Sequence, residues 1–156
     1  MAKYIATTLV LGALIIVAGL YLVFAPAPAV APTEDEQQVL DFTYVNATDD
    51  MIQVDLPFLG AVVGKEFSVL GVARGTWYFE ASFPVVLLDK DGNVLAQGHA
   101  EAQEDWMSEE FVPFKADLVV TNQNYIGPAT LILKNDNPSG DPVRDRSVSL
   151  PITVEY

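Results

Sequence analysis

The sequence contains no cysteine and a single histidine, and both scarcities narrow the range of functions. Without cysteine, packing and hydrogen bonds must stabilise the fold without disulfides, and no lipid can be attached through a cysteine. A hydrolytic triad would need His99 as its base, facing an activated nucleophile. Glu101 shares the predicted strand face of His99, but no serine stands in a glycine-flanked elbow. The sequence therefore predicts a protein that is not an enzyme and has no cofactor.

Basic side chains are also scarce. The chain has 8 Lys and Arg against 21 Asp and Glu, a formal charge of -13. Lys3 is the only charged side chain before Glu34, so the remainder carries 21 acidic and 7 basic side chains, a difference of -14. Such a surface repels phosphate backbones, and we expect no binding to nucleic acid. The acidity is most simply explained by solubility and self-repulsion.

Charge is absent altogether from residues 4–24, which also contain no proline. At the helical rise these residues span roughly 32 Å, the thickness of a hydrocarbon core. We therefore expect residues 1–24 to form an N-terminal, single-pass membrane anchor helix. Lys3 flanks one end of the apolar run and residues 34–36 are acidic, so the positive-inside tendency predicts a cytoplasmic N-terminus and an extracytoplasmic domain.

A cleaved signal peptide is the alternative to an anchor. Small residues at 27–29 and 29–31 resemble cleavage sites, although Pro32 directly follows Ala31. The apolar run is longer than the roughly 7–15 residues usual in a signal peptide, which favours the uncleaved anchor.

Residues 25–39 form a predicted spacer, beginning with the Pro- and Ala-rich run APAPAVAPT at 25–33. Alternating prolines favour extended polyproline II, at about 3.1 Å per residue, which would hold a domain clear of the headgroups. A connector of no particular length fits the same composition.

From residue 40 to 156, short runs rich in Val, Ile, Leu, Phe and Thr alternate with clusters of Gly, Pro, Asn and Asp. This pattern predicts an all-β domain, an antiparallel β-sandwich of about seven strands. Residues 41–46 are a further leading strand in this interpretation. The expected strands are residues 51–56, 67–73, 77–88, 94–102, 111–120, 129–134 and 147–155.

Several local features refine these strands. Pro84 indicates a sheet edge or bulge, and Asp91-Gly92 predicts a tight hairpin. Alternation along residues 94–102 places Val94, Ala96, Gly98 and Ala100 on one face and Leu95, Gln97, His99 and Glu101 on the other. Along residues 111–120 it places one set inward: Phe114, Ala116, Leu118 and Val120.

Residues 71–85, GVARGTWYFEASFPV, are followed in order by further short motifs: Leu88-Asp89, Asp91-Gly92, Trp106-Met107, Glu110-Phe111, Phe114, Asp136 to Gly140, and Leu150-Pro151-Ile152. This series resembles the signature of the immunoglobulin-like domain associated with bacterial sporulation and spore-germination proteins of the GerM type. The resemblance covers residues 51–156. It implies an immunoglobulin-like sandwich in a bacterial envelope protein, with a structural or binding role and no enzyme activity.

Two acidic segments are candidate calcium sites. Asp89, Asp91 and Asn93 begin like a calcium loop, but Ala100 stands where such a loop has its bidentate glutamate, so a hairpin turn is the better interpretation. The acidic loop, residues 101–110, contains only acidic charges, and weak calcium binding and a solvated loop both remain open. Its carboxylates are Glu101, Glu104, Asp105, Glu109 and Glu110.

Two groups of aromatic residues are candidates for binding. Trp77, Tyr78 and Phe79 are expected in or near a strand, where alternation buries one or two of them. Trp106 lies in the acidic loop. A buried Trp is usual in such sandwiches, whereas an exposed one anchors interfaces or stacks on sugars. Arg74 is one of few basic residues and is expected to pair with a carboxylate.

The sequence therefore predicts a non-enzymatic, membrane-anchored, extracytoplasmic immunoglobulin-like module of the bacterial cell envelope. Its partner would be the membrane through residues 4–24 and either another envelope protein or a second copy, bound through a sheet face, edge or loop. A carbohydrate or cell-wall binding module that uses Trp106 or Trp77 is the alternative.

Overall fold

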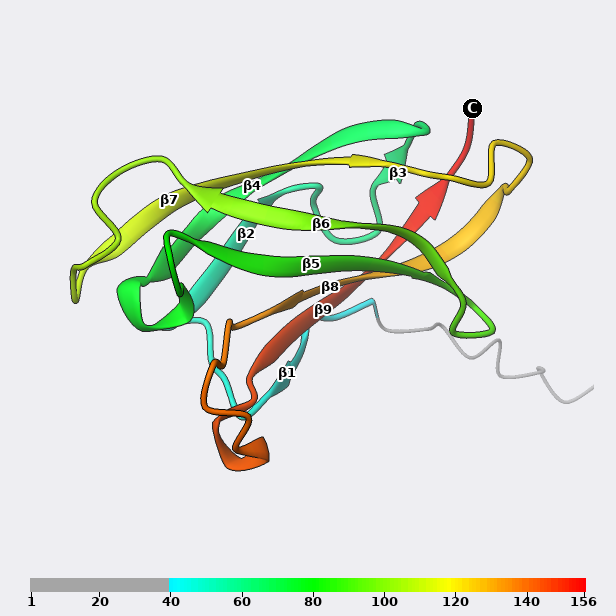
Figure 1. The fold of residues 1–156 in the computed structure, drawn as a ribbon. Coiled ribbons are helices and arrows are strands. Elements are labelled where there is room, and N and C mark those ends of the chain that lie inside the picture. Colours follow the sequence, from blue (N-terminus) through cyan, green and yellow to red (C-terminus); the bar gives the residue numbers. More distant parts are fainter. Residues whose placement is uncertain (1–39) are drawn as a thin grey trace, which may run out of the picture. The chain divides into compact units, whose positions relative to one another are not determined.

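Nine β-strands and two short 3-10 helices organise residues 40–156, which are the residues described by the structure, a computed structural model (Figure 1). The predicted anchor, residues 1–24, and spacer, residues 25–39, lie outside the described residues. Within the described part, no helix is long and apolar enough to cross a membrane. The elements are β1 (Thr43–Val45), β2 (Ile52–Leu56), β3 (Val62–Val63), β4 (Glu66–Arg74), η1 (Gly75–Trp77), β5 (Ser82–Asp89), β6 (Val94–Ala102), β7 (Phe111–Val119), β8 (Gly127–Lys134), η2 (Pro142–Arg144) and β9 (Ser147–Val154).

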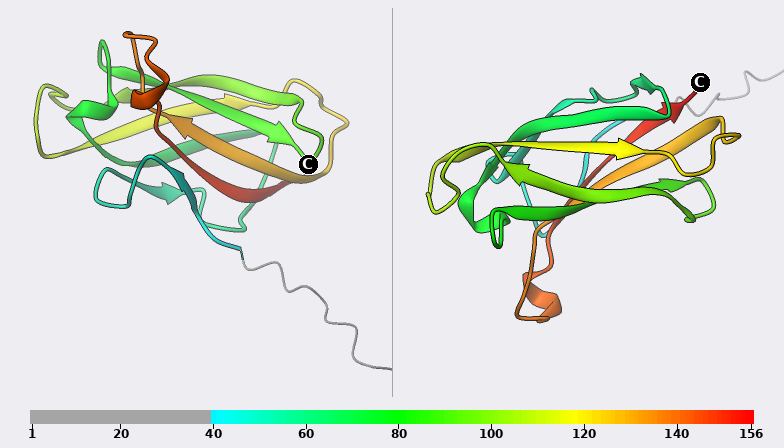
Figure 2. Two further views of the ribbon diagram at one scale, coloured as in Figure 1. Left: turned by 90° about the horizontal axis from the view of Figure 1, so that it is seen from below. Right: turned by 45° about the horizontal axis from the view of Figure 1, so that its top comes forward.

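The strands form one curled sheet in the order β1-β9-β8-β5-β6-β7-β4-β2. All these neighbours are antiparallel, and β3 adds a short parallel pairing to β9. Between β6 and β7 the ladder holds only at Glu101 with Lys115 and Ala102 with Phe114, so the sheet folds over at this line. Figure 2 shows the resulting two layers, with β5, β8 and β9 facing β4 and β7. The predicted all-β sandwich is confirmed, with nine strands among the described residues.

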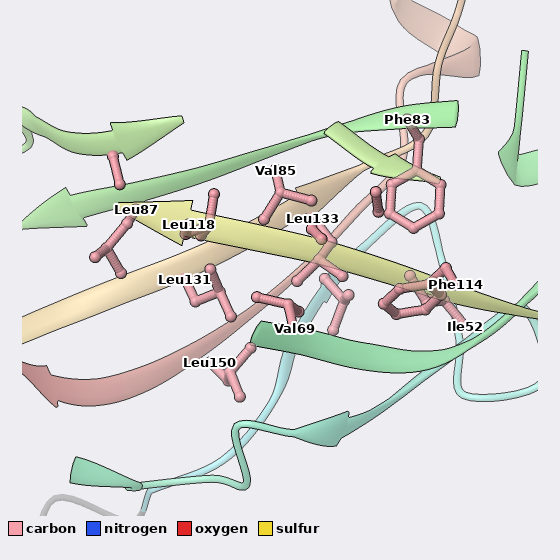
Figure 3. Packing of buried hydrophobic residues seen from close by; sticks show 14 of the residues in the cluster. Ile52, Val69, Phe83, Val85, Leu87, Phe114, Leu118, Leu131, Leu133 and Leu150 are labelled. Atoms are coloured by element: carbon pink, nitrogen blue, oxygen red, sulfur yellow. The ribbon is translucent and has the colours of Figure 1, made fainter. Parts of the chain in front are cut away.

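The core between the layers is apolar throughout. Strict alternation puts Val148, Leu150, Ile152 and Val154 of β9 inward, and β5, β7 and β8 follow the same rule. Among residues 40–156, every buried side chain is hydrophobic, and only the buried tyrosine and tryptophan among them carry a polar atom. Figure 3 shows Phe83 and Phe114 from opposite layers meeting in the core, their ring centroids 5.0 Å apart. Burial of these apolar faces, at about 25 cal/mol per Å², is the main stabilising contribution.

The predicted inward set on residues 111–120 is correct: Phe114, Ala116, Leu118 and Val120 are all buried. Pro84 also lies as expected, because β5 pairs with β8 only from Val85 onward. Pro84 therefore occupies a locally open edge, where the missing N–H costs no ladder bond.

Two details of the predicted strands are wrong. Residues 77–88 are not one strand, because Trp77 ends η1 and β5 begins only at Ser82. Alternation predicts Leu95 on the polar face of β6, but it is buried together with Ala96. The register shifts beside Leu95, as Leu87 pairs with Ala96 and Leu88 with Val94. This bulge inserts one residue and turns Leu95 inward.

Candidate interaction surface

Three segments gather at one end of the sandwich, and we call them together the loop end. They are residues 75–81, which contain η1 and the turn after it, the β6–β7 loop 103–110, and the β8–β9 loop 135–146 (Figure 1). The backbone N–H of Asp136 donates to the Trp77 carbonyl at 3.0 Å, which ties the third segment to the first. Thr76 and Tyr78 line two hollows, one shared with each neighbouring loop, so the three segments form one continuous surface.

Gly75 permits η1 to lie directly against the β6–β7 loop. A Cβ built on Gly75 would overlap the carbonyl oxygens of both Ser108 and Trp106. Any side chain at this position would therefore push the two backbones apart. The short segment GTW consequently has a packing role in bringing two parts of the loop end together.

Arg74, at the end of β4, holds the β6–β7 loop in place. Its Nε donates to the Asp50 carbonyl at 3.0 Å and its Nη1 to the Glu109 carbonyl at 3.1 Å. The guanidinium also lies 4.1 Å above the Phe111 ring and 3.7 Å from the Glu110 carboxylate, so the predicted ion pair is present. Because Glu110 is exposed, this ion pair contributes about 1 kcal/mol or less, and the main effect of Arg74 is to orient the loop.

A strained turn presents Phe79 at the loop end. Phe79 and Ser82 exchange backbone hydrogen bonds, and the two residues between them have positive φ, 49° at Glu80 and 64° at Ala81. Positive φ at both central positions is the type I′ pattern, which favours Asn and Gly, so Glu and Ala here carry strain. The side chain of Phe79 is 41% exposed beyond this turn.

Tyr78 lines both hollows and is held in place by a buried hydrogen bond. Its hydroxyl donates to the Val112 carbonyl at 2.7 Å, and burial raises the pKa of the phenol above its ordinary value. Trp77 is 1% exposed, so it belongs to the core and cannot stack on a sugar. The expectation that one or two of these aromatic residues are buried is correct, but η1 and the turn place them, not strand alternation.

Each of the three segments has an exposed apolar side chain, and two of these, Phe79 and Met107, line the hollows. Met107 is 77% exposed and Val143 82% exposed, and together with Phe79 they bring one such side chain from each segment. Trp106 is half-buried and lines a hollow of about 350 Å³ with Gly75, Thr76 and Met107. Apolar groups within a polar rim are typical of protein interaction sites.

The β8–β9 loop is stabilised by two asparagines. Asn135 accepts from the Arg146 N–H at 2.7 Å and donates to the Arg144 carbonyl at 3.2 Å. The Asn137 amide donates to the Asp145 carboxylate and to the Asp141 carbonyl, each at 2.8 Å. The loop borders a hollow of about 420 Å³ against Thr76, Tyr78 and Phe79, and its shape is set by these bonds.

His99 shows no catalytic environment. It lies exposed on β6, and its cross-strand neighbour is Pro84, which offers neither a nucleophile nor a proton. Glu101 follows on the same face, as predicted, and pairs in register with Ser82 and Lys115. His99 is therefore a solvent-facing strand residue with no nucleophile opposite it.

The two acidic segments differ in structure. The Asp89 carboxylate accepts from the N–H groups of Asp91 and Asn93 and from the Asn93 amide, and these bonds lower its pKa. This is the hydrogen-bonding pattern of a turn. Across residues 40–156, no three His, Asp or Glu side chains come together in a way that would hold a metal ion. Calcium binding at residues 101–110 stays a prediction.

The sequence pattern does not single out the β8–β9 loop as a site. The run NDNPSGDP, residues 135–142, has the composition of a turn, and it begins this loop. The feature of the sequence that could have marked this loop is its charge, since three of the seven basic residues after Lys3 are Lys134, Arg144 and Arg146.

A family model for the immunoglobulin-like domain of bacterial spore germination matches residues 51–141. The match begins just before β2 and ends within the β8–β9 loop, so it contains most of the loop end. No curated protein matches the chain.

Proposed function

Because the chain belongs to the family of immunoglobulin-like domains of bacterial spore germination, we propose that it is a membrane-anchored, extracytoplasmic interaction module of the bacterial cell envelope. The loop end binds a partner protein in this proposal. The observation that carries it is that two exposed apolar side chains from separate segments, Phe79 and Met107, line adjoining hollows, while Val143 is exposed on the third segment. Such hollows with apolar anchors favour binding to another protein surface.

The backbone around these anchors supports the same proposal. Gly75 and Arg74 hold the β6–β7 loop, Asn135 and Asn137 hold the β8–β9 loop, and the strained turn holds Phe79. A surface whose loops are already fixed loses less conformational entropy on binding. Strain that the surrounding structure maintains is also a feature of functional sites.

Leu40, the first described residue, contacts a part of the domain away from the loop end. The Leu40 side chain lies against Gly60, whose N–H donates to the Pro151 carbonyl of β9 at 2.9 Å. The β8–β9 loop instead precedes Ser147, the first residue of β9. Leu40 therefore lies beside the C-terminal half of β9, whereas the β8–β9 loop lies at the opposite end of this strand.

Fractionation of cells that express the full chain tests the anchor. We expect the protein in the membrane pellet after an alkaline wash, and a variant without residues 4–24 in the soluble fraction. Protease added to intact spheroplasts should digest residues 40–156. A mature protein whose mass lacks the first 29 to 31 residues would instead show a cleaved signal peptide.

Co-purification from solubilised membranes tests the interaction. Met107→Asp places a charge among the apolar anchors and should reduce recovery of the partner by at least about tenfold, since each 1.4 kcal/mol is a factor of ten. The matched control is Val94→Asp, because Val94 is also exposed, at 54%, but lies at the other end of β6. Equal recovery with both variants would exclude the loop end as the binding surface.

A further inference from the structure

The β8–β9 loop concentrates basic side chains in a strongly acidic domain. After subtraction of Lys3 and the acidic residues 34–36, the described part of the chain carries 18 Asp and Glu and 7 Lys and Arg. Lys134, Arg144 and Arg146 lie within or directly before this one loop. The same stretch, residues 134–146, also carries Asp136, Asp141 and Asp145, so its formal charge is zero, whereas the other described residues carry 15 acidic and 4 basic side chains. An anionic ligand is therefore repelled by most of the domain surface and least of all here.

Among residues 40–156, the two guanidinium groups of this loop have no ion-pair or hydrogen-bond partner. In residues 40–156 the ion pairs use Arg74, Lys90 and Lys115. Within the same residues, the hydrogen bonds of Arg144 and Arg146 involve only their backbone groups. Both guanidinium groups thus keep their donors available for a ligand.

Both arginines line the hollow of about 420 Å³, a size within the usual range of about 300–1,000 Å³ for ligand sites. Phe79 and Pro138 contribute apolar surface to the lining. The backbone that carries Arg144 and Arg146 is fixed by both hydrogen-bonding groups of the Asn135 side chain. The site therefore combines positioned cationic groups with an apolar wall.

We propose that this hollow binds the carboxylate of a peptide, with Arg144 and Arg146 as its donors. The planar fork of a guanidinium matches the two oxygens of a carboxylate and forms charge-assisted hydrogen bonds with both. Asp136 also lines the hollow, so the lining holds two guanidinium groups and one carboxylate. The net charge suits a monoanion, because the second charge of a phosphate would be repelled by Asp136.

The residue that bears the carboxylate packs against Phe79 and Pro138, and the rest of the peptide leaves through the open side of the hollow. This inference rests on the proposed function in taking its ligand from an envelope partner. Two envelope sources supply such a peptide: an acidic segment of a protein and the stem peptides of the cell wall.

Fluorescence anisotropy of the detergent-solubilised full chain with a labelled Ala-Ala-Glu peptide, amidated at its C-terminus so that it carries one carboxylate, tests the site. Saturable binding is expected, and Arg144→Gln with Arg146→Gln in one chain should weaken it at least about tenfold. Lys90→Gln and Lys115→Gln make the same change of charge outside the hollow and should leave the affinity within about twofold. An Ala-Ala-Gln peptide amidated at its C-terminus is the neutral control.

The proposal is overturned if the neutral peptide binds as well as the acidic one, or if the double arginine variant binds like the wild type. Co-sedimentation with purified peptidoglycan separates the two sources. Sedimentation that the double variant loses assigns the site to stem peptides, and peptide binding without sedimentation assigns it to a protein segment. The double arginine variant is also carried through the co-purification from solubilised membranes. Lost peptide binding with full partner recovery, or the reverse, makes failure of this site and failure of the proposed function distinguishable.

Discussion

Gly75 and Ser108 lie so close that the backbone of η1 contacts the carbonyl oxygen of the β6–β7 loop with no room for a Cβ. Gly75→Ala should therefore destabilise the domain by about 2 kcal/mol or more, because backbone and not a flexible side chain must move. Urea denaturation with an unchanged m-value measures this loss.

Gly98 provides the matched control. A Cβ there would lie 3.1 Å from the Leu118 Cδ2 atom, which belongs to a side chain that can shift by a few tenths of an ångström. Gly98→Ala should cost about 1 kcal/mol or less. Equal losses for the two variants would show that Gly75 has no special packing role.

Replacement of Ala81 by glycine should increase the stability of the domain. Its φ of 64° is unfavourable for a residue with a Cβ, so Ala81→Gly should stabilise the domain by about 0.5 kcal/mol after the extra entropy of the unfolded chain is subtracted. Ala100→Gly, in the buried part of β6, should instead destabilise it by about 1 kcal/mol. The two melting temperatures should move in opposite directions, and a joint decrease would contradict the strain at the turn.

The two tryptophans should respond differently to truncation. Trp77 is 1% exposed and packs edge-on against Phe83, with ring centroids 6.3 Å apart, so Trp77→Ala should cost about 3–5 kcal/mol. Trp106 is half-buried in a loop, and Trp106→Ala should cost less than about 2 kcal/mol. Chemical denaturation compares them, and a larger loss at Trp106 would refute the assignment of Trp77 to the core.

Because Tyr78 is buried, the folded domain should lose stability at alkaline pH. Its pKa is raised by burial in the folded state, so above the ordinary value near 10 the unfolded chain releases a proton that the folded chain keeps. The contribution of Tyr78 is complete below about pH 10 and falls by at most about 1.4 kcal/mol per pH unit above it.

Tyr78→Phe removes this proton and should flatten the decline between about pH 10 and 12. A small slope should remain, because burial and nearby Asp49 and Asp41 also raise the pKa of Tyr44. The variant also leaves the Val112 carbonyl without its donor, which lowers stability at pH 7 by about 1–2 kcal/mol. An unchanged alkaline slope would contradict the assignment to Tyr78.

The strands that alternation predicts correctly are those buried on one face. On β7, polar or solvent-facing residues separate Phe114, Ala116 and Leu118, so period two identifies both the strand and its inward side. The bulge beside Leu95 was not predictable, since a register shift depends on the partner strand and leaves no local mark. The two-residue β3 is likewise too short to show any period.

The loop end was only partly predictable. Trp106 and Phe79 are candidates because of their type, but their exposure depends on η1 and on the turn at Glu80, where alternation predicts a strand. The hollow beside Arg144 forms only when residues 76–79 and 135–146 meet, and that contact joins segments far apart in the sequence. The sequence by itself shows only that basic residues cluster at the β8–β9 loop.

Photocrosslinking in intact cells tests whether the loop end binds a partner outside the membrane. A photoreactive amino acid at Met107 should give an adduct of discrete mass on illumination, and the same amino acid at Val94 should give none, since both positions are exposed at opposite ends of the domain. An adduct from Val94 alone, or none from either position, would show that the loop end is not the binding surface.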